Sequence, residues 1–139
     1  MKRWRGGSPA ADTITTKRRL TRSRDADAYF YANERFHYAI YAASHNTFLA
    51  EEAAALQRKL RPYRRLQLRV RNRIQRSFEE HQAIVDALRE GDAEKAALSV
   101  RNHVIVQGER FADLVSSLSR LEAAGVGAEL EAGLAPAVG

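Results

Sequence analysis

The chain has 139 residues, of which 45% are hydrophobic, and a formal net charge of +6 at pH 7. This size allows one domain with a real core, and the absence of cysteine excludes disulfide scaffolds and thiolate metal sites. No apolar run approaches the roughly 20 residues that a membrane span requires. The first basic residues are not followed by an apolar signal region, so we expect a cytoplasmic protein without membrane contact.

The basic residues are unevenly distributed. Eight of the 23 lysine and arginine residues lie within residues 1–24, together with a single acidic residue, Asp12. Glycine, proline and hydroxyl residues interrupt this segment, and no periodic apolar pattern is evident. A basic segment can neutralise phosphates of a nucleic acid, but charge alone specifies no partner. We therefore predict a basic, poorly ordered leader over residues 1–24.

Helical periodicity dominates the rest of the chain. The first predicted helix covers residues 25–43, where apolar residues recur at a spacing near 3.6, and Asp25 or Asp27 supplies an N-terminal carboxylate. The second begins after Asn46 or Thr47, and Pro62 predicts a kink near its end because it lacks a backbone donor. Its last part enters a segment, Arg58–Arg76, with nine basic residues and no acid; a solvated helix face explains it better than an anion-binding rim.

The third predicted helix covers residues 73–89, and Gly91 marks its left-handed C-terminal stop. Asp92 then caps a fourth helix that extends to about Leu121. Strand-like alternation is absent from these segments. We predict an all-α antiparallel helical bundle over residues 25–121, followed by a flexible tail over residues 122–139.

Three of the four histidines lie on the apolar stripes of three different predicted helices: His37, His81 and His103. Asn33 precedes His37 by one turn and projects from the same face. A bundle can bring such side chains to one point, and neutral imidazoles are common ligands of divalent transition metals. The alternative is that each histidine is a hydrogen-bonded core residue. His45 lies in a break between helices, where a turn role suffices.

Several ordered motifs resemble the FCD domain, the effector-sensing C-terminal domain of a branch of GntR-family bacterial transcription regulators. Asn33–His37 and the Ala-Ser-His-Asn sequence ending at Asn46 resemble the family's D/N-x-x-F-H and A-S-x-N motifs. Ser77–Ile84 resembles S-x-x-E-H-x-x-I, and Ala87–Ala96 resembles A-L-x-x-G-D-x-x-A-A. With His103 as the last histidine, the resemblance covers about residues 25–118.

The resemblance implies a helical bundle that holds a divalent metal, most often zinc or nickel, through Asn33, His37, His81 and His103. It further implies that a small carboxylate metabolite completes the coordination. Binding would alter the affinity of a homodimer for DNA through a separate winged helix-turn-helix, which we expect to be absent from this chain. Arg64, Arg65 and Arg101 are our candidates for secondary contacts to the effector.

Besides the expected lack of a DNA-binding domain, the sequence departs from the family pattern in two further respects. Asn33 stands where the metal-binding branch usually has aspartate, which predicts lower metal affinity or water as the fourth ligand. The family's domain also begins with further helices, and residues 1–24 show no apolar stripe able to replace them. We therefore expect a truncated or divergent regulator with one open face, which favours self-association.

We weigh this sensing domain, which is not an enzyme, against two alternatives. The first is a truncated structural helical module without a ligand. The second is a metal-dependent hydrolase, because three histidines and a water can generate a nucleophile. The carboxylates beside the histidines in sequence, Glu34 and Glu80, are about 100° round the helix and are expected to face elsewhere. That expectation disfavours hydrolysis, which requires a general base near the water.

Overall fold

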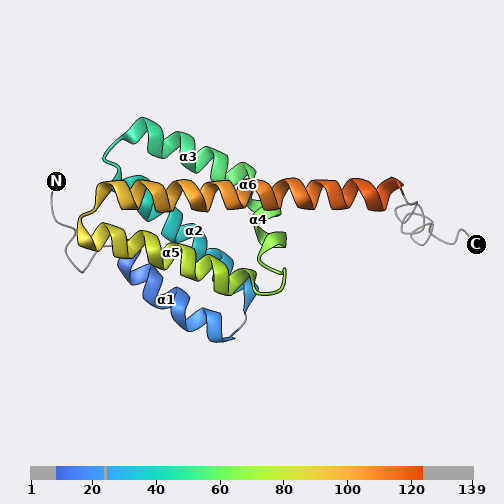
Figure 1. Ribbon diagram of the computed structural model, residues 1–139, viewed down its shortest axis with the longest axis horizontal. Coiled ribbons are helices and arrows are strands. Elements are labelled where there is room, and N and C mark those ends of the chain that lie inside the picture. Colours follow the sequence, from blue (N-terminus) through green and yellow to red (C-terminus); the bar gives the residue numbers. More distant parts are fainter. Residues whose placement is uncertain (1–8, 24, 124–139) are drawn as a thin grey trace, which may run out of the picture. The chain divides into compact units, whose positions relative to one another are not determined.

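A computed structural model describes residues 9–23 and 25–123 of the chain, and within these ranges all regular structure is helical (Figure 1). This confirms the predicted all-α class. The elements, in chain order, are α1 (Pro9–Ser23), α2 (Ala26–Ala43), α3 (Thr47–Lys59), α4 (Arg61–Gln67), α5 (Arg73–Glu90) and α6 (Ala93–Ala123). Most of the predicted tail, from residue 124 onward, lies outside the described residues.

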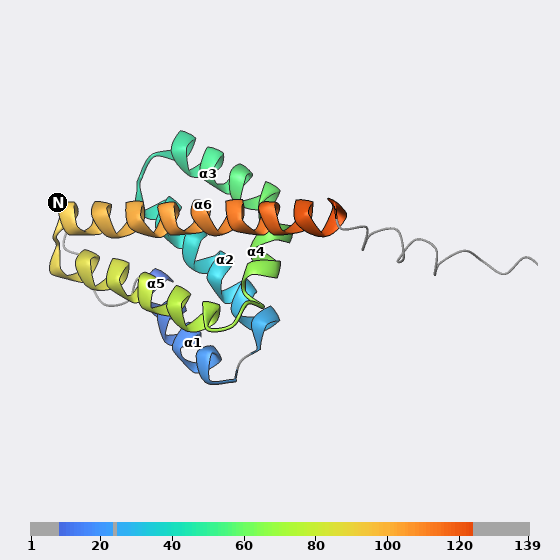
Figure 2. The ribbon, with the colours of Figure 1, turned by 45° about the vertical axis from the view of Figure 1, so that its right-hand side comes forward.

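The chain divides into two units, residues 1–104 and residues 105–139, and the candidate site lies in the first. In that unit α1 packs against both α2 and α5, and α2 packs against α3 and α4. Figures 1 and 2 both show α1 beside α5. The search for an apolar helix long enough to cross a bilayer found none in the described part of the chain.

Helix α1 corrects our expectation of a poorly ordered leader over residues 1–24. Pro9 begins the helix at a position where a missing backbone donor has little effect. Ala10, Ile14 and Lys17 follow at spacings of three and four residues and are all buried. The sequence interpretation missed this stripe because it contains a small residue and a lysine. Residues 1–8 and 24 lie outside the described residues.

Helix α1 also supplies part of the hydrophobic core, so the open face that we expected there is covered. One buried cluster joins α1, α2 and α5 through Ala10, Ile14, Phe36, Ile84 and Val85. A second cluster, of Tyr29, Phe30 and Leu68, lies nearer the end of α4. Each Å² of apolar surface that is buried stabilises the fold by about 25 cal/mol, so these two clusters are the main source of stability.

The predicted helix boundaries agree closely with the structure after residue 25. The Asp25 side chain accepts from the Ala28 backbone N–H at 2.9 Å, and Asn46 accepts from Leu49 at 3.0 Å. The long second helix that we predicted is divided rather than kinked: α3 ends at Lys59, Leu60 is its C-cap, and α4 begins at Arg61 with Pro62 in its first turn. Because proline lacks an N–H, it is tolerated at such a start.

Gly91 ends α5 in the left-handed conformation, with φ of 73°, as predicted. We expect Gly91→Ala to lower the free energy of unfolding by about 1 kcal/mol. The cause is backbone strain alone, because a Cβ at this position would meet no neighbour within 4 Å. Urea denaturation measures the loss. Gly108→Ala is the matched control: that helical glycine also has open space around it, so the change should stabilise the protein, and a loss of similar size would contradict the strain argument.

Candidate metal centre

Three helices each place one histidine in the bundle interior. His37 lies on α2 after the buried Asn33, His81 lies on α5 after the buried Ser77, and His103 lies on the first part of α6. Their exposed fractions are 8%, 0% and 4%. Repetition at four residues places each histidine on the same face as the core residues of its helix, as the stripes predicted.

The three imidazole rings form one cluster. Each ring offers a nitrogen, and these nitrogens all lie within 4.8 Å of one another. The Nε2 atoms of His81 and His103 are 3.1 Å apart, close to the roughly 3.3 Å that separates two ligands at about 2.0 Å from a tetrahedral zinc. Phe36 stacks on His81 with ring centroids 4.2 Å apart and thereby fixes the plane of that ring.

The Nε2 atom of His37 is buried and has no hydrogen-bond partner. Buried polar atoms almost always have a partner, so an orphaned nitrogen on a ring that lies beside two other imidazoles requires one. A divalent metal ion would satisfy this atom, and imidazole donors suit zinc and nickel. The donor set therefore fits the metal that the sequence predicted.

A buried network holds His103 in position. The Glu80 carboxylate accepts from His103 Nδ1 at 2.7 Å and from both terminal nitrogens of Arg73, at 2.8 and 3.0 Å. Arg73 itself is only 2% exposed. Burial acts to raise the pKa of Glu80, but the hydrogen bonds from His103 and Arg73 outweigh it and lower that pKa to about 2. The ionised carboxylate keeps the proton of His103 on Nδ1 and leaves Nε2 free to bind an ion.

This network corrects our expectation that Glu80 faces away from the histidines. The backbone direction of Glu80 does differ from that of His81, but its long side chain reaches His103 on another helix. Glu34 does face elsewhere, since it pairs with Arg61 at 3.0 Å and accepts from Tyr38.

Lys17 is a component of the site that the sequence did not predict. Its Nζ donates to the Asn33 Oδ1 at 3.0 Å and contacts His81 Nδ1. It also lies 4.8 Å from the centre of the Tyr29 ring and 4.9 Å from that of Phe36. Ser77 donates a further hydrogen bond to the same Asn33 oxygen at 3.4 Å. The amide oxygen predicted as a metal ligand is therefore occupied by two donors.

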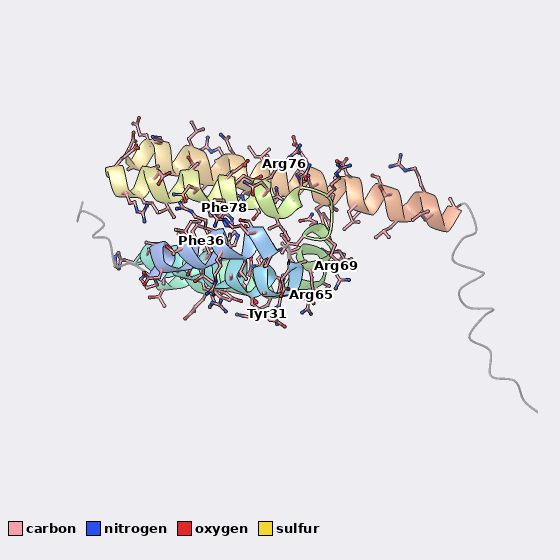
Figure 3. All side chains as sticks on the ribbon, turned by 90° about the horizontal axis from the view of Figure 1, so that it is seen from below. Tyr31, Phe36, Arg65, Arg69, Arg76 and Phe78 are labelled. Atoms are coloured by element: carbon pink, nitrogen blue, oxygen red, sulfur yellow. The ribbon has the colours of Figure 1, made fainter. Side chains whose placement is uncertain are left out.

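The three arginines predicted as effector contacts lie in different surroundings. Arg64 is half-buried, and its positive charge adds to the effect of burial in lowering the pKa of His37. Arg65 is at the surface, where it pairs with Asp27 at 3.2 Å and donates to Tyr31. Arg101 is exposed. Figure 3 shows the contrast between Arg65 and Arg69 at the outside of the bundle and Phe36 and Phe78 between its helices.

We expect Glu80→Gln to weaken zinc binding by about 10- to 100-fold, because a neutral amide no longer fixes the proton of His103 on Nδ1. Titration of the metal-free protein against a chromophoric chelator measures this change. Circular dichroism accompanies it, since Arg73 loses its buried partner. Glu79→Gln is the control: Glu79 is exposed and pairs only locally, with Gln75 at 2.8 Å. Equal affinities of the two variants would contradict the role of Glu80.

We expect the metal-free domain to lose stability as the pH falls from about 7 to about 5. Burial lowers the pKa of His37, His81 and His103 below the ordinary 6.5. Below pH 6.5 the unfolded chain therefore binds more protons than the folded one, and the free energy of unfolding decreases as the pH decreases. The slope is at most about 1.4 kcal/mol per pH unit for each proton. Urea titrations across this range measure it, and a flat profile would contradict burial of neutral rings.

The described residues thus form an all-helical domain, and the three converging histidines give its interior a polar site. The FCD domain matches residues 10–105, and the chain belongs to this family, whose members are the effector-binding domains of GntR regulators. The match begins within α1, which corrects the boundary that we predicted at residue 25. Comparisons with curated proteins and with solved structures found no match.

Proposed function

We propose that this domain senses a small organic acid through a divalent metal, zinc or nickel, held by His37, His81 and His103. The observation that supports this most directly is the unpartnered Nε2 of the buried His37, whose ring lies in one cluster with two other imidazoles. Hydrogen-bonded core histidines, the simpler alternative, would not leave this nitrogen without a partner.

The donor set suits a sensor. Three neutral imidazoles leave the ion its full positive charge and at least one open position, where the metal would act as a Lewis acid toward a carboxylate oxygen. Arg64 supplies a further positive charge beside His37. These features favour a small anion over a neutral ligand. In this proposal Asn33 joins the coordination only when its oxygen is released by Lys17.

We propose that the domain acts in the cytoplasm as part of a homodimer, and that a winged helix-turn-helix domain makes the DNA contacts. An effector that binds two arrangements of the helices with different affinity shifts their populations. Because the metal-binding histidines come from α2, α5 and α6, binding of the effector would adjust three helices at once.

Hydrolysis is less well supported. A hydrolase needs a base beside the metal-bound water, and the nearest carboxylate, Glu80, is held by Arg73 and His103. It contacts His103 at Nδ1, which is the side of the ring opposite the proposed ligand atom. Glu80 therefore orients a ligand and is poorly placed to activate water.

Elemental analysis of purified protein tests the metal site. We expect about one zinc or nickel ion per chain in the wild type and in His45→Ala, and none in His81→Ala. His45 is an exposed histidine outside the cluster, so its variant controls for adventitious binding. Equal metal in all three proteins would overturn the assignment and favour a helical module without a ligand.

A thermal-shift panel tests sensing. Small mono-, di- and tricarboxylates are added to the metal-loaded protein and, in parallel, to chelator-treated protein. We expect at least one acid to raise the melting temperature only when metal is present. A response that survives the chelator would show that the acid binds without the metal, and absence of any response would contradict sensing of carboxylates.

A further inference from the structure

The Lys17 side chain reaches from α1 into the cluster of histidines. Its Nζ contacts His81 Nδ1 and donates to the Asn33 oxygen, and the side chain is fully buried. The amine of Lys17 therefore lies inside the protein next to the place where a metal ion would bind. Burial, with the nearby charge of Arg73, lowers the pKa of Lys17. Burial of an amine is costly unless it has polar partners, and Asn33 and His81 are those partners.

The proton positions in the cluster follow from the hydrogen bond between His103 and Glu80. The Glu80 carboxylate can only accept, so the proton of the His103 ring is on Nδ1 and its Nε2 is an acceptor. The Nε2 of His81, 3.1 Å away, must then be the donor. With its proton on Nε2, His81 has a lone pair on Nδ1, the atom that Lys17 Nζ contacts.

The same arrangement is incompatible with a metal on His81 Nε2. A nitrogen that carries a proton has no lone pair for an ion. If that proton moved to Nδ1, it would point at the Lys17 amine, which would have to stop donating to that atom. The oxygen of Asn33, the fourth predicted ligand, is likewise engaged by Lys17. One amine thus blocks two of the four predicted ligands.

We propose that Lys17 is an internal competitor of the metal ion: it occupies His81 and Asn33 in the empty site and must withdraw before an ion binds. This inference rests on the proposed metal site and adds an antagonist to it. Since Lys17 belongs to α1, loading of the site is coupled to the packing of α1 against α2 and α5.

Affinity measurements test the competition. Metal-free wild type and Lys17→Met are titrated with Zn²⁺ against a chromophoric chelator, and Met preserves the length and burial of the side chain. We expect Lys17→Met to bind at least tenfold more tightly. Arg18→Met is the matched control, because Arg18 follows Lys17 on α1 but is exposed and bonds Gln82; its affinity should equal that of the wild type.

The outcomes separate this inference from the proposed function. Zn²⁺ binding by wild type and Lys17→Met with equal affinity, or weaker binding by the variant, overturns the competition and leaves the metal site standing. Absence of binding by both overturns the metal site and the competition together. Binding of Zn²⁺ by Lys17→Met and not by the wild type would support the competition most strongly. Lys17→Leu provides a second apolar replacement if the Met variant does not fold.

The tautomer of His81 provides a readout that requires neither metal nor a variant. Nitrogen-15 NMR of the histidine side chains distinguishes a proton on Nδ1 from a proton on Nε2. In metal-free wild-type protein we expect His81 to carry its proton on Nε2 and His103 to carry its proton on Nδ1. A His81 protonated on Nδ1 would overturn the proposal, since Lys17 would then not be donating to that atom.

Discussion

Zinc is expected to raise the free energy of unfolding of the metal-free domain by about 4.1 kcal/mol once the free ion exceeds its Kd a thousandfold. The reason is linkage: the three imidazoles meet only in the folded state, so the ion binds that state alone. Urea denaturation at fixed free zinc, set with a metal buffer, measures the gain. Removal of the ion with a chelator should reverse it fully.

His81→Ala is expected to abolish this stabilisation, because the central ring of the cluster is lost. Its contacts with both other histidines make it central: ring centroids lie 4.9 Å from His37 and 4.5 Å from His103. His45→Ala should retain the whole gain. Zinc stabilisation of similar size in His81→Ala would place the ion elsewhere and contradict the site.

Phe36→Ala is expected to lower the free energy of unfolding by about 3–5 kcal/mol, a large share of the stability of a domain of this size. Phe36 is 1% exposed, belongs to the cluster that joins α1, α2 and α5, and stacks on His81. Its removal therefore leaves a cavity and releases a ligand ring. Urea denaturation monitored by circular dichroism gives the loss.

Two controls distinguish cavity formation from a general effect of losing an aromatic residue. Phe48 is 69% exposed, so Phe48→Ala should change stability by less than about 0.5 kcal/mol. Phe36→Leu should lose less than Phe36→Ala because most of the volume remains. Equal losses in Phe36→Ala and Phe48→Ala would contradict the core position of Phe36.

The sequence predicted the helical class and the convergence of the histidines because both depend on simple periodicity. His37, His81 and His103 each stand on an apolar stripe, and a bundle turns such stripes inward. Capping residues were equally informative: Asp25, Asn46 and Gly91 mark helix ends in the structure as they do in the sequence.

The parts that were missed depend on side-chain length and on tertiary packing. The stripe of α1 ends in a lysine, and a charged residue is read as exposed unless its partners are known. Those partners, Asn33 and His81, lie on other helices. Glu80 was misplaced for a related reason: its direction follows from the helix, but the reach of its carboxylate to His103 does not.

The three side chains proposed to hold the ion are all imidazoles, and the whole sequence lacks cysteine. Thiolate sites lose their ions when oxidants convert sulfur to sulfenic acid or to a disulfide. An imidazole shell has no such reaction available under mild oxidation. The centre should therefore keep its ion during peroxide exposure, and its signal should follow the supply of its ligand and not the oxidative state of the cell.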